Sequence, residues 1–548
     1  MLSFTLTISA RNRHKFECPQ PEAELPEYFS GLCFPAAGRT RLVQTGRRIG
    51  STMTTHSSFQ STSSGFAIPA LFFSLLLAGP APGQTINTQI GDLEFESGYP
   101  QSQTVQILYD ELDFQRAVQA YLWALPMASY GAMADAHHEL GADTHTVVIA
   151  DKLAEPRQLA LTANRDTVYM SGVFDLRDGP MVMDLPPGLL GTMNNIWQQP
   201  LVDLGGPFSP EQNRGGRFLI LPPNYDGPMP ATHHHIVRSD TNIVVFYLRG
   251  IPKSKEDIPE VVEQIKKYRQ YRLDEAADPP ATQFVSLAGK DADLLTNEGF
   301  AYFETLARYI NENPPRPQDM AMLGMLQTLG IAHGQPFEPD ERMKAILTEA
   351  ATVGRAMAKT LAYSPRVPGE IVYAYPGERR WKRIFFSDPT FHEPDFMAID
   401  LRSKYAFEAI GTAKSMVISV PGQGSQYIGL YQDGNGDWLT GDNTYRIHLP
   451  KNVPANMFWS LTVYDNETRS MIQNEAGRPL VGSVHGAAPN QDGSFDVYFG
   501  PTQPTNVPES NWVQTTPGKG WFVYLRLYGP EQPYFDKTWI PGDADRVD

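Results

Sequence analysis

The sequence predicts a mainly β protein of the α+β class, with two antiparallel β-sandwich or jelly-roll domains and a helical middle segment. Short runs that alternate polar with apolar side chains fill residues 146–249 and return from residue 370 to the end, separated by turn signals such as Asp-Gly and Pro-Pro-Gly. Between these two regions, apolar residues recur at spacings of three and four, which indicates helices. The chain has 548 residues, 41% of them hydrophobic, so it is long enough for two or three domains with their own cores.

The first 83 residues are expected to be a leader with a signal peptide. Residues 66–77 form an apolar run that is closed by small residues and prolines at 78–83. A bilayer span needs about 20 such residues, so this run is too short to cross a membrane. Its length and small-residue exit predict a signal peptide cut near Gly83, with translation starting at either Met1 or Met53. We therefore expect a secreted or periplasmic protein with no transmembrane helix in the mature chain.

Cysteine usage and charge narrow the function classes further. Cys18 and Cys33 are the two cysteines of the chain, and both lie in the expected leader. The mature chain is then expected to lack disulfides, thiolate nucleophiles and cysteine-ligated zinc. The formal net charge of −16 repels phosphate backbones and disfavours nucleic acid as a partner. A small-molecule or glycan ligand is expected, and a homo-oligomer stays possible.

Helical patterns stand before and between the two β regions. Residues 109–138 are predicted to be helical with a kink at Pro126, and His137 and His138 are expected at the helix end, where they suit the dipole. The stretch 254–257 has the pattern of a capping box before another helix. Further helices are expected near residues 294–311, 320–331 and 339–362. The predicted domains are an N-terminal β-domain preceded by a helix (84–250), a helical connector (251–369) and a C-terminal β-sandwich (370–548).

A string at residues 162–176 concentrates residue types that serve recognition and chemistry. On a strand, Asn164 and Asp166 share one face, and Arg165 and Tyr169 share the other. We predict Asp166 as a catalytic acid or base and Tyr169 as its catalytic partner, with Asn164 and Arg165 in substrate binding. The alternative is structural, with Asn164 and Asp166 capping a turn and Arg165 pairing with a carboxylate.

A second string, at residues 458–470, mixes aromatic residues with arginine. Trp459 and Arg469 are predicted to bind an apolar ring or a sugar that carries a carboxylate. Trp459 fits the core of a sandwich equally well. Trp512 and Arg526, from strings near the C-terminus, are also predicted to bind substrate and carry the same ambiguity.

Two clusters suggest metal ligands, but no metal or cofactor is assigned. His233 and His235 would share one face of a strand, and two imidazoles still need a further ligand. Asp433, Asn435 and Asp437 offer oxygen atoms at alternate positions, as at the start of a calcium loop, without the glutamate that such a loop needs. For the histidines the preferred interpretation is a sequence variation on an ordinary strand, and for the Asp and Asn cluster it is a tight turn. Metal binding at either cluster stays open.

The two strings also carry a family resemblance. The first resembles the signature of the family called domain of unknown function 1254, and the second resembles its C-terminal companion, domain of unknown function 1214. The resemblance covers roughly residues 100–545 and extends through residues 215–227, 422–427, 511–518 and 524–530. It implies a β-rich sandwich in the C-terminal half and names no reaction.

The expected function is enzymatic, of hydrolase or lyase type, on a saccharide-like or small organic substrate at the interface of two β-domains. The sequence has no P-loop, no nucleophile elbow on a strand and helix, and no H-E-x-x-H motif, so nucleotide chemistry and common serine hydrolysis are disfavoured. The alternative is a non-catalytic cell-envelope protein that binds glycan or lipid. An enzyme needs a titratable group beside a partner in a closed pocket, whereas a binding module presents aromatic residues on an open face.

Overall fold

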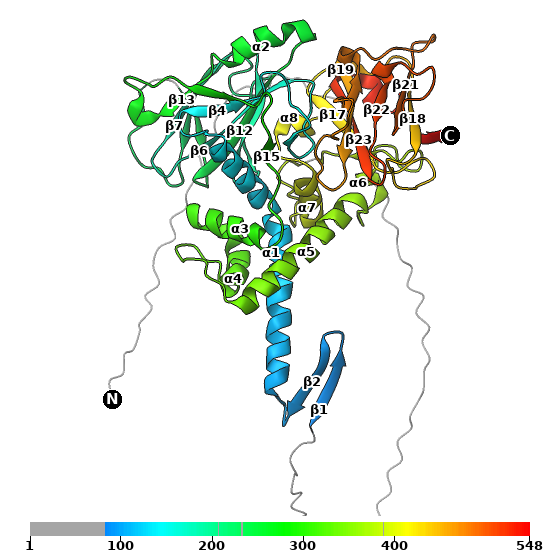
Figure 1. Ribbon diagram of the computed structural model, residues 1–548. Coiled ribbons are helices and arrows are strands. Elements are labelled where there is room, and N and C mark those ends of the chain that lie inside the picture. Colours follow the sequence, from blue (N-terminus) through cyan, green and yellow to red (C-terminus); the bar gives the residue numbers. More distant parts are fainter. Residues whose placement is uncertain (1–82, 207, 232–233, 387, 548) are drawn as a thin grey trace, which may run out of the picture. The chain divides into compact units, whose positions relative to one another are not determined.

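The computed structural model describes residues 83–206, 208–231, 234–386 and 388–547 (Figure 1). The expected signal peptide, both possible start sites and both cysteines lie outside the described residues. The described residues all belong to one unit, Ala78–Asp548, with helices and many strands in several sheets. The predicted combination of helices and β-sheets is confirmed at this level.

The long helix α1 (Ser102–Glu139) organises the helical part of the chain. It begins earlier than predicted, at Ser102, and continues through Pro126. Most side chains from Ala117 to Met133 are buried, in a cluster that this helix shares with neighbouring helices. Figure 1 shows α3 (Phe300–Glu312), α4 (Met320–Thr328) and α5 (Glu341–Tyr363) beside it, and all three contact it. In the described ranges, no helix combines the length and apolar character needed to cross a bilayer. Near the N-terminal end of α1 lies a small sheet of β1 (Gln84–Thr88), β2 (Gly91–Glu96) and β3 (Tyr99–Pro100).

Sheets of mixed direction follow α1, where the sequence predicts antiparallel pairing throughout. Most neighbours are antiparallel, but β14 pairs with β4 and β10 pairs with β11 in parallel. The sheet orders are β14-β4-β6-β12-β8-β9, β11-β10-β7-β13 and β15-β5. The strands are β4 (Thr146–Ile149), β5 (Gln158–Leu159), β6 (Val168–Asp175), β7 (Met181–Leu185), β8 (Leu190–Asn195), β9 (Pro200–Leu204), β10 (Gly216–Leu221), β11 (His235–Arg238), β12 (Ile243–Gly250), β13 (Arg269–Arg272), β14 (Gln283–Ser286) and β15 (Ala292–Asp293).

The register of β6 on β12 decides which side chains face the site. Tyr169 lies opposite Arg249, and Ser171 lies opposite Tyr247. Directly opposite residues point to the same side of a sheet, so these four form one polar patch. The alternate residues of β6, such as Met170, pack into an apolar core on the other side.

The helix after these strands begins as the sequence predicts. Ser254 and Asp257 form a capping box, in which the Asp257 carboxylate accepts a hydrogen bond of 2.9 Å from the backbone N–H of Ser254. The helix α2 (Ile258–Ile265) then buries Val262 and Ile265. The 3₁₀ turns are η1 (Lys255–Asp257), η2 (Leu273–Glu275), η3 (Pro317–Asp319), η4 (Ser483–His485) and η5 (Glu509–Asn511).

The C-terminal part contains two sheets that share one apolar cluster. Their orders are β16-β17-β23-β19-β20 and β22-β21-β18-β24. The cluster includes Val463 and Leu525 from the first sheet and Ile447 and Phe499 from the second. The strands are β16 (Lys382–Arg383), β17 (Ser425–Leu430), β18 (Thr444–Leu449), β19 (Ala455–Asp465), β20 (Leu480–Gly482), β21 (Phe495–Gly500), β22 (Trp512–Gln514), β23 (Trp521–Pro530) and β24 (Ala544–Val547).

The expectation that residues 370–548 hold β-structure throughout is wrong at α7 (Ile399–Glu408), a helix whose buried face is charged. Lys404 and Glu408 form an ion pair of 2.9 Å, and each side chain is 1% exposed. The Tyr431 hydroxyl also donates a hydrogen bond of 2.9 Å to Glu408. Buried charges hide the apolar period that sequence reading needs. Shorter helices are α6 (Gly369–Val372), α8 (Lys414–Val417) and α9 (Gln532–Phe535).

Removing one charge of this pair should destabilise the fold. In Glu408→Gln the ammonium of Lys404 stays buried without its counter-ion, so we expect the free energy of unfolding to fall by about 3 kcal/mol. Glu341→Gln is the matched control, because its pair with Lys344 is 92% and 44% exposed and should contribute under about 0.5 kcal/mol. Urea denaturation of both variants measures the difference. Equal midpoints would show that the buried pair does not stabilise the fold.

Candidate functional site

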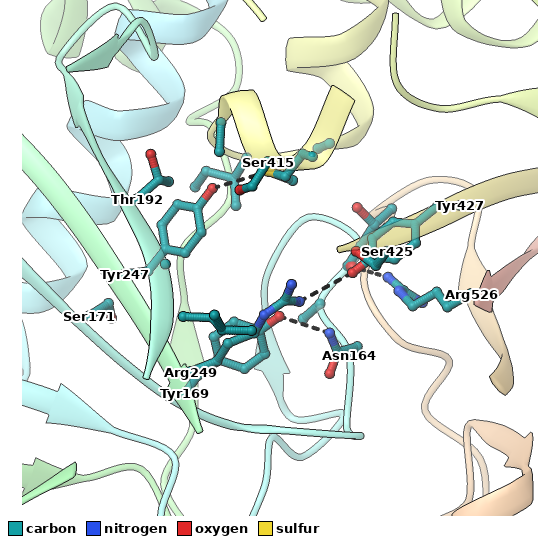
Figure 2. Close-up of a pocket in the computed structure, with 18 of the residues that line it drawn as sticks. Asn164, Tyr169, Ser171, Thr192, Tyr247, Arg249, Ser415, Ser425, Tyr427 and Arg526 are labelled. Carbon is teal, nitrogen blue, oxygen red and sulfur yellow. Dashed lines mark hydrogen bonds between the residues drawn. The ribbon is translucent and has the colours of Figure 1, made fainter. Parts of the chain in front are cut away.

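A cavity of about 450 Å³ lies between the β6–β12 wall and the strands β17 and β23 of the C-terminal sheet. Its lining is mostly apolar, with side chains such as Leu161, Leu190, Ile384 and Phe385. Figure 2 shows the polar side chains that gather in it. These are Asn164, Tyr169, Ser171, Thr192, Tyr247, Arg249, Ser415, Ser425, Tyr427 and Arg526.

The cavity opens to solvent between two loops. Phe208 and Asn213, from the segment after β9, are exposed and also line the cavity. Gly422, Gln423 and Gly424 lie before β17 and are exposed lining residues too. A small ligand can therefore reach the interior between these segments.

Arg249 stands on the N-terminal wall with its guanidinium directed at the opposite wall (Figure 2). Its Nη1 donates a hydrogen bond of 3.3 Å to the hydroxyl of Tyr427. The guanidinium also lies 5.5 Å from the ring centroid of Tyr528, within cation–π range. Among the described residues, no carboxylate forms an ion pair with Arg249, and its strongest charge partners are tyrosines.

Arg526, on β23, carries the second guanidinium of the site and is buried. Its Nη2 donates a hydrogen bond of 2.7 Å to the carbonyl oxygen of Thr162, while Nε and Nη1 have no hydrogen-bond partner among the described residues. The guanidinium lies 4.7 Å from the ring of Tyr427 and 5.5 Å from the rings of Tyr464 and Tyr524. Cation–π contacts with these three rings are therefore the main interactions that stabilise its positive charge.

Tyr427 lies between these two cations, and they change its acidity. Burial alone would raise the pKa of Tyr427, but the charges of Arg249 and Arg526 outweigh it and lower the pKa to about 8. The Tyr427 hydroxyl lies 3.2 Å from that of Tyr528, whose pKa burial raises well above the usual value. Tyr427 is therefore the member of this pair that ionises first.

Both guanidiniums stay protonated in this setting. Burial opposes the charge of Arg249 and of Arg526, but the nearby tyrosine oxygens raise the pKa of each above its usual value. The cavity wall thus holds two fixed positive charges. The carboxylate of Asp166 acts on Arg526 from beyond ion-pair distance.

Asp166 lies behind the cavity wall and is not among the residues that line it. Its Oδ1 lies 3.0 Å from Nε2 of His485, and its Oδ2 accepts a hydrogen bond of 2.7 Å from Ser460. The Asp166 side chain is fully buried. The structure therefore places this predicted catalytic carboxylate outside the cavity lining, in contact with His485 and Ser460.

The two strings that the sequence singles out meet at this point. The bond from Ser460 to Asp166 joins them, and the Tyr464 hydroxyl donates a bond of 2.7 Å to the carbonyl oxygen of Ala163. The backbone N–H of Thr162 donates to the carbonyl of Arg469 at 2.8 Å. These contacts bring the N-terminal and C-terminal halves together behind the cavity.

Asn164 combines a structural and a site role. Its Nδ2 donates to the hydroxyls of Tyr169 at 2.8 Å and of Tyr528 at 3.0 Å. Its Oδ1 accepts a bond of 3.0 Å from the backbone N–H of Asp166, so the turn expected as the alternative is present as well. Because the oxygen of Tyr169 accepts from Asn164, the proton of Tyr169 is left for another acceptor.

Of the residues predicted from the sequence, Asn164, Tyr169 and Arg526 line the cavity and the others do not. The aromatic and arginine residues outside it have structural partners. Arg165 bonds the carbonyl of Gly477 at 2.9 Å, Trp459 packs in the C-terminal core against Phe495, Arg469 bonds the carbonyl of Phe407 at 3.1 Å and Trp512 bonds the carbonyl of Gly500 at 3.1 Å.

Arg249, Tyr427, Ser171 and Tyr247 are site residues that the sequence prediction missed. One usable signal was the position of Tyr247 and Arg249 at alternate places in an otherwise apolar strand. Tyr427 lies in the stretch 422–427, which resembles the family. Nothing in that stretch distinguishes it from a tyrosine of the core.

The candidate metal clusters have other contacts where the structure describes them. Asp433 Oδ1 accepts hydrogen bonds from the backbone N–H groups of Asn435 and Asp437, as in a tight turn. The ring of His235 lies 5.0 Å from that of Phe218, and His233 lies outside the described residues. Within the described ranges, no group of three or more His, Cys, Asp or Glu residues is placed to hold a metal ion.

Two family models match parts of the chain, and one solved structure has a similar fold. Residues 144–272 match the model of the protein of unknown function DUF1254, and residues 424–532 match that of the protein of unknown function DUF1214. No curated protein matches the chain. The crystal structure of the VPA0106 protein from Vibrio parahaemolyticus is 18% identical, with a TM-score of 0.50 over 80% of this chain and 100% of that one. An uncharacterized protein from Burkholderia cenocepacia is 14% identical, with a TM-score of 0.35 over 82% of this chain and 97% of that one. The chain is thus a protein that combines DUF1254 in its N-terminal half with DUF1214 in its C-terminal half.

Proposed function

We propose that this protein is a lyase-type enzyme that binds a small organic carboxylate in the cavity and removes a proton beside the carboxylate group. The observation that carries the proposal is Tyr427, which lies between the half-buried guanidinium of Arg249 and the buried guanidinium of Arg526. Neither has a carboxylate in ion-pair contact among the described residues. Such a site favours an anion and an ionised tyrosine.

In this proposal the guanidinium of Arg249 binds the carboxylate group of the ligand. A buried cation costs free energy unless an anion or good hydrogen bonds compensate it. Both arginines line the cavity, but Arg249 is half-buried, whereas Arg526 is 1% exposed and lies against the ring of Tyr427. A guanidinium is well suited to bind a carboxylate through two parallel hydrogen bonds.

The body of the ligand is proposed to be apolar. The cavity size of about 450 Å³ is that of a site for a small organic molecule. A saccharide would need polar partners along its whole length, whereas Leu161, Leu190 and Phe385 offer none. Of the two substrate classes expected from the sequence, the small organic one has the better support.

The residues of the cavity supply the steps of an elimination. The Tyr427 phenolate takes the proton from the carbon next to the carboxylate, and the positive charge of Arg249 stabilises the enolate-like charge that develops. A C=C bond forms as a leaving group departs from the next carbon, and Tyr169 gives that group its proton. Asn164 bonds the oxygen of Tyr169 and so leaves that proton directed elsewhere.

A second candidate function is non-catalytic binding of a lipid-like carboxylate, and the apolar lining favours it. Deuterium exchange separates the two candidates without knowledge of the leaving group. The purified protein is incubated with phenylacetate in D₂O, and NMR follows loss of the methylene protons. Exchange that disappears in Tyr427→Phe supports the enzyme, whereas tight binding without exchange supports the binding protein.

We also propose that the protein is exported and that its C-terminal half is a β-sandwich of jelly-roll type. Residues 66–83 have the composition of a signal peptide, which supports export to the periplasm or the exterior. The apolar cluster shared by both C-terminal sheets supports a sandwich of jelly-roll type in that half. The proposal includes a homo-oligomer, for which we assign no contact surface.

Loss of the Arg249 charge should weaken carboxylate binding. For Arg249→Gln we expect the affinity for phenylacetate to fall by about 30-fold or more, because a charge-assisted hydrogen bond is lost. Arg165→Gln is the matched control, since Arg165 bonds the carbonyl of Gly477 and lies outside the cavity. Isothermal titration calorimetry measures both. Equal losses in the two variants would contradict the assignment of Arg249 as the carboxylate site.

Carboxylate affinity should also fall as the pH rises through about 8, where Tyr427 ionises. Below that pH the tyrosine is neutral and the two cations attract the ligand, whereas above it the phenolate supplies an internal anion that competes. In Tyr427→Phe this decrease should disappear while the affinity at pH 7 persists. Titrations between pH 6 and 9 test this, and a wild-type affinity that stays constant up to pH 9 would contradict it.

A further inference from the structure

The cavity has a second polar region, two strand residues away from Arg249. Ser171 and Tyr247 face each other on β6 and β12, two positions along from the pair formed by Tyr169 and Arg249. Two residues of a strand span about 7 Å. A ligand that holds its carboxylate at Arg249 can therefore present its other end at Ser171 (Figure 2).

His137 fixes the direction of the hydrogen bond that Ser171 makes. Nδ1 of His137 lies 2.8 Å from the carbonyl oxygen of Met133, which can only accept, so this nitrogen carries the proton. Burial lowers the pKa of His137 to about 4, so the ring is neutral at pH 7 and its Nε2 is a bare acceptor. Nε2 lies 2.8 Å from Oγ of Ser171, and the serine must donate its proton to it.

Ser171 is therefore left with lone pairs for a ligand and with no proton to give. Its Oγ can accept a hydrogen bond from a hydroxyl or N–H group but cannot donate one to an ether or carbonyl oxygen. Tyr247 adds a hydroxyl at the same end. Burial raises its pKa well above the usual value and so keeps it protonated, and it donates to the weak acceptor Sδ of Met416 at 3.9 Å. The end opposite the arginine is polar, and at Ser171 it selects for a donor.

We propose that the ligand is an apolar carboxylic acid with a hydroxyl group on its far end, and that Ser171, held as an acceptor by His137, selects that hydroxyl. The proposal rests on the proposed function in one respect, since the carboxylate is placed at Arg249. Ser171 is a specificity-determining residue in it and takes no part in bond making. An analogue with a methoxy group in place of the hydroxyl brings an oxygen that cannot donate, and a buried acceptor is then left unpaired.

Calorimetric titration of two matched ligand series tests this selection. The probes are phenylacetate and 3-phenylpropanoate, each unsubstituted, with a 4-hydroxy group and with a 4-methoxy group, so that two spacings are sampled. We expect the hydroxy compound of at least one series to bind about tenfold more tightly than its methoxy analogue. In Ser171→Ala the two should bind equally, while the unsubstituted acid binds as in the wild type, which also shows that the variant is folded.

The control is Ser415→Ala, which removes another hydroxyl from the same cavity and should keep the preference. A preference that survives Ser171→Ala, that vanishes in Ser415→Ala or that is absent from the wild type in both series would overturn the assignment of Ser171 and leave the carboxylate site intact. If no carboxylate binds, the unsubstituted acids included, the proposed function fails and this inference fails with it.

Discussion

The site depends on two guanidiniums, half-buried Arg249 and buried Arg526, that have no carboxylate in ion-pair contact among the described residues. A charge in an apolar interior is costly, and proteins usually compensate it with a counter-ion. Here the compensation comes from tyrosine rings and oxygens and from the carbonyl of Thr162, with Asp166 acting at longer range. The excess positive charge lowers the pKa of Tyr427 and makes the cavity attractive to an anion. The proposed acid–base chemistry and the proposed carboxylate ligand both rest on this excess of positive charge.

The fold holds these charges on two facing walls. Arg249 lies on β12, which is flanked by β6 and β8, and Arg526 lies on β23, which is flanked by β17 and β19. Interior strands are paired along both edges, so side chains on them are well positioned for precise geometry. The hydrogen bonds from Ser460 to Asp166 and from Tyr464 to Ala163 join the two walls behind the cavity. Each half of the chain therefore contributes one cation to a single site.

Strand periodicity predicted part of this site and could not predict the rest. It placed Tyr169 on a strand face, and that face lines the cavity. It could not assign Trp459, because residues 458–464 of β19 are buried on both faces and alternation then carries no signal. Arg249 was missed because its strand is otherwise apolar, and only the register with β6 sets it opposite Tyr169. Parallel pairs such as β14 with β4 depend on contacts distant in sequence, and the buried charges of α7 hide its helical period.

The ionisation of Tyr427 is the quantity that tests the central claim most directly. Ultraviolet difference spectroscopy of the phenolate, recorded from pH 6 to 11 on the wild type and on Tyr427→Phe, isolates this one residue. The account predicts a tyrosine that ionises near pH 8 in the wild type and that is missing from the variant. If the wild type and the variant titrate alike, with no tyrosine ionising below the usual value of about 10, the two arginines do not act on Tyr427 as described.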